Sequence, residues 1–123
     1  MGRSLDVPFA DAIDRVKAAF KAEGFGVITE VDFRKTLHDK IGEEIEPYVI
    51  LGMCNPNLAS QALKAEHEIG LLLPCNVIVH ECRGKVHVAA LDPEAMLALA
   101  RSSALDPVAD EAKPRIEKAM KLL

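Results

Sequence analysis

The chain has 123 residues, a formal net charge of −4 and a pI near 5.5, and half of its residues are hydrophobic. A negative chain without a basic run is a poor partner for nucleic acid or an anionic membrane. No apolar stretch approaches the ~20 residues of a membrane-spanning helix, and the N-terminus has no apolar signal core. We therefore expect one soluble, cytoplasmic domain over residues 1–123, and its three cysteines are expected to be reduced thiols.

The first half of the chain is predicted to alternate between helix and strand. Apolar side chains recur at helical spacing over residues 8–23, and Gly24 is expected to end that helix. Residues 25–31 are then expected to form a strand. One face of this strand is expected to carry Phe25, Val27 and Val31.

A short second helix is predicted to begin after Asp32, which is a good N-cap residue, and to end at Gly42. Its apolar side is formed by side chains four residues apart, namely Phe33, Leu37 and Ile41.

The centre of the chain is predicted to be a strand-helix-strand unit. Residues 48–54 and 71–79 are apolar runs typical of strands. Between them Asn55 can cap a helix whose first position is Pro56, and Gly70 is expected to end it.

Residues 75–82 and 85–91 are predicted to pair as a hairpin, because only Arg83 and Gly84 separate them. Counting outward from the turn pairs Cys82 with Lys85, His80 with His87, Ile78 with Ala89 and Asn76 with Leu91. The opposite face is uniformly small and apolar and should meet the helices; it carries Cys75, Val77, Val79, Val86, Val88 and Ala90. Two further helices are expected over residues 93–100 and from Pro107 onward, the last one kinked near Pro114.

Four strings, GFGVITEVD (24–32), LGMCNPNLASQAL (51–63), GLLLPCNVIV (70–79) and LDPEAML (91–97), resemble the bacterial domain of unknown function 302 (DUF302) family in order and spacing. The resemblance implies an α+β fold, a mostly antiparallel sheet with helices on one face in a layout like that of the TATA-box-binding protein. It also implies a homodimer, and it brings no established activity or cofactor.

Cys54 and Cys75 lie in the most recognisable of these strings. A thiol next to a helix N-terminus is favoured as thiolate, so Cys54 is a candidate reactive or ligand-binding residue; the alternative is a small buried side chain at a strand end. The candidate ligand-binding residues are Cys54, Asn55, Cys75 and Asn76. If the strands around the central helix were parallel, Cys54 and Cys75 would lie at opposite ends of the sheet, too far apart for a disulfide within one subunit.

A second candidate site is the opposed pair of His80 and His87, with Cys82 one pair further along the hairpin. Opposed imidazoles can share a zinc or copper ion, with a thiolate as third ligand. The alternative is an exposed polar pair near the hairpin end.

Two functions remain open. The preferred one is a homodimeric domain that binds a small molecule or metal, with one sheet face packed on a second subunit. That face carries Asn76, Ile78, His80, His87, Ala89 and Leu91. The other is a thiol-dependent redox or transfer enzyme that uses Cys54 as nucleophile. No clear general base lies near Cys54 in the sequence, although His38, His67 or His80 could approach it in the fold.

Overall fold

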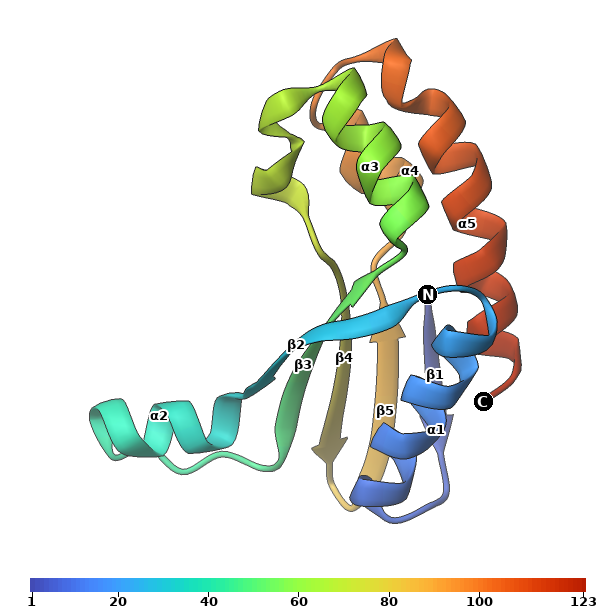
Figure 1. Cartoon of the computed structure of the whole chain (residues 1–123). Coiled ribbons are helices and arrows are strands. Elements are labelled where there is room, and N and C mark those ends of the chain that lie inside the picture. The colour runs from blue at the N-terminus through green and yellow to red at the C-terminus, as the bar shows by residue number, and fades with distance from the viewer.

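The computed structural model, which describes residues 1–123, contains one antiparallel sheet of five strands in the order β1-β5-β4-β3-β2 (Figure 1). Every neighbouring pair of strands is antiparallel. The strands are β1 Gly2–Leu5, β2 Gly26–Asp32, β3 Tyr48–Cys54, β4 Cys75–Cys82 and β5 Lys85–Ala90. The α+β fold with an antiparallel sheet is thereby confirmed.

The helices differ in their position relative to the sheet. In Figure 1, α1 and the C-terminal part of α5 lie beside the sheet, whereas α3 and α4 lie beyond the end at which β3 finishes and β4 begins. None of the helices is both long and apolar enough to cross a membrane. They are α1 Phe9–Ala22, α2 Phe33–Ile41, α3 Pro56–Ala65, α4 Pro93–Ala98 and α5 Asp106–Lys121, with two 3₁₀ segments, η1 His67–Leu72 and η2 Ser103–Leu105.

The predicted hairpin register is confirmed. Cys82 pairs with Lys85, His80 with His87 and Ile78 with Ala89. Its small apolar face forms the centre of the core, where the four valines Val77, Val79, Val86 and Val88 are at most 3% exposed. The helix stripes of α1 and α5 cover this face, because Val16, Phe20 and Ile116 are buried in the same cluster.

The helix ends follow their capping residues. Asp32 accepts a hydrogen bond from the N–H of Lys35, and Asn55 accepts one from the N–H of Leu58. Gly24 and Gly42 both adopt the positive φ that ends a helix, as predicted. Helix α5 continues through Pro114.

Three sequence predictions need correction. Helix α3 ends at Ala65 rather than Gly70, and η1 occupies the first part of the expected 71–79 strand, which begins only at Cys75. The strand over Gly26–Asp32 is interrupted by a bulge, because Val27 pairs with Met53 while Thr29 pairs with Gly52. The extra residue reverses the alternation of faces, so Val27 and Val31 lie on opposite faces rather than on one.

Strand β1 was not predicted. It completes the sheet beside β5, where Arg3 pairs with Val88 and Ser4 pairs with His87. The guanidinium of Arg3 also donates hydrogen bonds to the carbonyl oxygens of Met120 and Lys121, 3.1 and 3.2 Å away, which join this strand to the end of α5.

The second face of the sheet is covered by no helix. Partly exposed side chains of Tyr48, Ile50, Ile78 and Ala89 lie on it, together with the two opposed histidines. Helix α2 projects from the edge of the sheet, as Figure 1 shows, and contains no buried residue. Phe33 at its start contacts Tyr48 edge to face, with ring centroids 6.3 Å apart, so the apolar side of α2 continues that of the open face.

Candidate functional site

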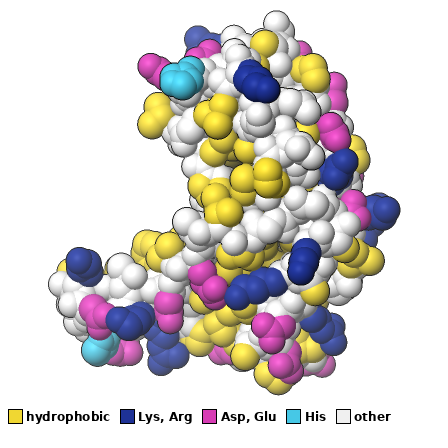
Figure 2. Space-filling model, viewed as in Figure 1, with side chains coloured by type: hydrophobic (Ala, Val, Ile, Leu, Met, Phe, Trp, Pro, Cys, Tyr) yellow, Lys and Arg dark blue, Asp and Glu magenta, His cyan; other side chains and the backbone are white.

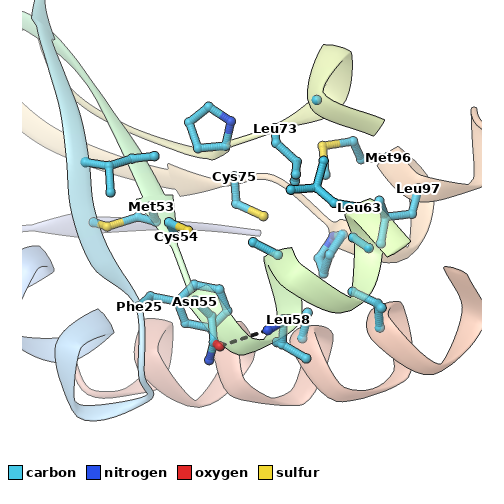
Figure 3. A pocket seen from close by; sticks show the side chains of 18 residues that line it. Phe25, Met53, Cys54, Asn55, Leu58, Leu63, Leu73, Cys75, Met96 and Leu97 are labelled. Atoms are coloured by element: carbon cyan, nitrogen blue, oxygen red, sulfur yellow. Dashed lines mark hydrogen bonds between the residues drawn. The ribbon is translucent and has the colours of Figure 1, made fainter. Parts of the chain in front are cut away.

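A cavity of about 320 Å³ lies at the end of the sheet from which α3 and α4 extend. Eighteen residues line it and fourteen of them are hydrophobic (Figure 3). They come from the end of β3, the start of β4, β2 and the residue before it, α3, α4 and α5, and the segment before Cys75. No histidine, carboxylate, lysine or arginine is among them. The cavity is therefore an almost purely apolar site.

Cys54 and Cys75 both line this cavity. Because β3 and β4 are antiparallel and Met53 pairs with Cys75, the end of β3 lies beside the start of β4. The parallel arrangement that would have separated the two cysteines is wrong. The chain instead brings both thiols to one end of the sheet within a single subunit, and both are free.

The two thiols have different surroundings. Burial raises the pKa of the Cys75 thiol to about 11, and the nearby Cys54 adds a smaller electrostatic contribution in the same direction. Cys75 is thus a neutral thiol at pH 7. Cys54 stands immediately before the N-cap of α3, where the positive end of the helix dipole lies.

Asn55 fixes the position of α3 at the cavity. Its side chain is 7% exposed and accepts a hydrogen bond of 3.2 Å from the N–H of Leu58, shown as the dashed line in Figure 3. The amide also packs closely against Gly24, where an added Cβ would lie 2.9 Å from the Asn55 Nδ2. Asn55 therefore lines the cavity and also serves as a structural cap.

The fourth predicted ligand-binding residue lies elsewhere. Asn76 is exposed and pairs with Gly52. Strand alternation places its side chain on the open face of the sheet, and the cavity lining does not include it. The structure thus brings together Cys54, Asn55 and Cys75 but not Asn76.

The predicted metal ligands lie on the open face. The rings of His80 and His87 are 5.3 Å apart between centroids, and Tyr48 stacks on His80 at 5.2 Å. A hydrogen bond of 2.9 Å joins His87 Nδ1 to the Ser4 hydroxyl. No group of three or more His, Cys, Asp or Glu side chains is arranged to hold a metal ion, so Cys82 does not complete a three-ligand set. Metal binding by the histidine pair stays a prediction.

The sequence patterns missed most of the cavity wall. Ile28 reaches the cavity from the β2 bulge, while Leu63, Met96 and Leu97 reach it from α3 and α4. At the cavity mouth Ile28 and Leu63 are 61% and 42% exposed. Figure 2 shows hydrophobic side chains gathered in the hollow between α3 and β2. The signal in the sequence is that Ile28 directly follows Val27, which places one apolar residue at an alternating position otherwise held by Gly26, Glu30 and Asp32.

Comparisons with known proteins agree with the fold. An uncharacterised conserved DUF302 protein from Bacillus stearothermophilus, known from its crystal structure, superimposes with a TM-score of 0.90 at 24% identity, covering 99% of this chain and 95% of that one. A search of curated proteins finds no significant match. The family model described as "Domain of unknown function DUF302" matches residues 1–123. The chain therefore belongs to the DUF302 family.

Proposed function

We propose that the protein is a homodimeric binding domain that holds a small, largely apolar molecule in the cavity beside Cys54 and Cys75. The observation that carries this proposal is the cavity itself, about 320 Å³ in volume with fourteen hydrophobic residues among its eighteen. Ligand pockets in proteins begin at about 300 Å³ and are mostly apolar with few polar groups. The cavity matches that description in both respects.

The lining also sets the chemistry of the ligand. A charged group would lose its hydration without a partner in return, because no ionisable side chain other than the two thiols faces the cavity. An apolar group gains about 0.8 kcal/mol for each buried CH₂. The expected ligand is thus a neutral ring system or a short hydrocarbon chain.

The open sheet face supports the dimer. Ile50 and Ile78 lie there without a covering helix, and the adjoining α2 has no buried residue of its own. A contiguous apolar surface of this kind is rarely left bare, and a two-fold contact between identical faces is the commonest way to bury it.

The alternative, a thiol-dependent enzyme that uses Cys54, gains no support from the cavity. A cysteine nucleophile is normally activated by an adjacent base, and no histidine or carboxylate lines the cavity beside Cys54. We therefore retain the binding function.

Binding can be tested with the neutral fluorophore N-phenyl-1-naphthylamine. Ala59, on α3, lines the cavity, so Ala59→Phe should fill it and weaken probe binding by at least about tenfold, the equivalent of 1.4 kcal/mol. Ser60→Phe adds the same ring on the exposed side of the same helix and should bind as the parent does. Equal binding by all three proteins, or none by the parent, would contradict the proposal.

A further inference from the structure

The apolar wall of the cavity is also rich in sulfur. Its wall contains sulfur from four side chains, the thiols of Cys54 and Cys75 and the thioethers of Met53 and Met96, all labelled in Figure 3. Oxygen and nitrogen donors are nearly absent, because Asn55 supplies the only polar side chain other than the thiols. Asn55 already uses its carbonyl oxygen to cap α3. The side-chain donors at this wall are therefore mainly sulfur, which is a soft ligand for metal ions.

We propose that Cys54 and Cys75 bind one Cu(I) ion as a pair of thiolates at the wall of this cavity. Soft thiolate and thioether ligands favour Cu(I), zinc and iron–sulfur clusters. Of these, Cu(I) is the one that two sulfur ligands can hold, in a near-linear arrangement. The antiparallel register places both cysteines at the same end of the sheet, with Met53 opposite Cys75.

The same wall disfavours the commoner ions. Calcium and magnesium require carboxylate, carbonyl or water oxygens, and no carboxylate lines the cavity. Structural zinc requires four ligands from Cys, His or carboxylate groups, and the structure forms no cluster of even three such residues. Two thiols in an apolar wall therefore favour a soft monovalent cation over zinc.

Charge and protons balance without an added oxidant or reductant. Cu(I) forms two Cu–S bonds, both S–H bonds break, and two protons pass to the solvent, leaving a complex with one negative charge. The positive end of the α3 dipole lies beside Cys54 and stabilises that charge. A bound metal ion deprotonates a coordinating thiol outright, so the neutral state of free Cys75 is no obstacle.

The test is an anaerobic competition for Cu(I) against bicinchoninate at pH 7, with the full chain kept reduced. The parent should take up one copper ion per chain. Cys54→Ser and Cys75→Ser should each lose at least about 100-fold in affinity, because loss of an outer-shell partner alone costs 10–100-fold. Cys82→Ser is the matched control, since Cys82 is exposed at the far end of β4 and should be irrelevant.

His87→Ala separates this site from the histidine pair on the open face, and it should also bind as the parent does. The proposal would be overturned if Cys54→Ser and Cys75→Ser each still bound copper as the parent does, or if copper binding depended on Cys82 or His87.

X-ray absorption of the parent's copper complex gives a readout that does not depend on how the variants fold. Only sulfur should surround the copper, and a nitrogen or oxygen ligand would contradict the assignment. The copper competition and the X-ray absorption do not depend on whether N-phenyl-1-naphthylamine binds, so they test the copper site separately from the proposed function.

Discussion

Gly52 illustrates how a single residue positions the cavity. It lies on β3 where Thr29 and Pro74 approach from both sides, and a Cβ at this position would overlap the Thr29 Oγ1 and lie 2.7 Å from the Pro74 Cγ. The missing side chain therefore lets β2 and the segment before Cys75 close on β3. Thr29 is the first residue paired after the bulge, so this contact also helps to fix the position of Ile28 at the cavity mouth.

Gly52→Ala is expected to lower the free energy of unfolding by about 1–3 kcal/mol, the usual cost of overpacking. Urea unfolding would measure it. Gly26→Ala, also on a strand but with no atom within 4 Å of the added Cβ, should change stability little. Thr29→Ala should recover part of the loss when combined with Gly52→Ala, and full additivity of the two substitutions would show that the contact does not limit packing.

Cys75 should make stability depend on pH in the alkaline range. Its pKa is raised from 9.0 to about 11 by burial in the folded state, so the folded chain holds this proton more tightly than the unfolded chain does. The resulting stabilisation is complete below pH 9 and is lost as the pH rises toward 11. Between pH 8 and 10.5 the parent should lose more unfolding free energy than Cys75→Ala does. Cys82→Ala should follow the parent, and the same pH dependence in all three proteins would refute the buried-thiol account.

Among the helices and strands, sequence signals correctly predicted the features that depend on interactions between residues close together in the chain. Asn55 and Pro56 located the start of α3, and the two-residue turn at Arg83 and Gly84 located the hairpin and its register. Both depend on backbone geometry within a few residues. The same reasoning failed for η1, because Leu71 and Leu72 read as strand residues although they lie in a 3₁₀ segment.

The candidate site was predictable only in part for the same reason. Cys54 and Asn55 stand at the predicted start of α3, and Cys75 lies in a string that resembles the DUF302 family, so these three residues could be selected from the sequence. The cavity wall instead combines β2, α3, α4 and α5, and no local pattern reports that these segments meet. The direction of β4 relative to β3 decided whether Cys54 and Cys75 are neighbours, and apolar periodicity is the same for parallel and antiparallel strands.

The cap of α3 gives the element-level prediction. Asn55→Ala removes the acceptor for the Leu58 N–H and should destabilise the protein by about 1 kcal/mol, within the 0.5–2 kcal/mol range of N-cap losses. Asn57→Ala, at an exposed position in the same helix, is the control and should cost much less. If denaturant unfolding gave equal losses for the two variants, the cap would not be what holds α3 in place.

For the whole molecule, the open sheet face and α2 make the proposed dimer testable. Ile78 lies on β4 opposite Ala89 and pairs with Ile50 on its other side. Ile78→Glu would place a charge from each subunit near the two-fold axis and desolvate both, at a cost of several kcal/mol. Sedimentation at micromolar concentration should show a dimeric parent and a monomeric Ile78→Glu. Ser60→Glu, on the exposed side of α3, should remain dimeric. A monomeric parent, or a dimeric Ile78→Glu, would show that this face is not the interface.

The central claim is that a small apolar molecule binds between α3 and the end of the sheet. Methyl NMR during titration with N-phenyl-1-naphthylamine tests it most directly, because the methyl groups of Ile28, Leu58, Leu63 and Met96 line the cavity whereas those of Ile50 and Ile78 do not. We expect saturable shifts confined to the cavity methyls. Shifts confined to the isoleucines of the open sheet face, or no shifts at any methyl, would contradict the account.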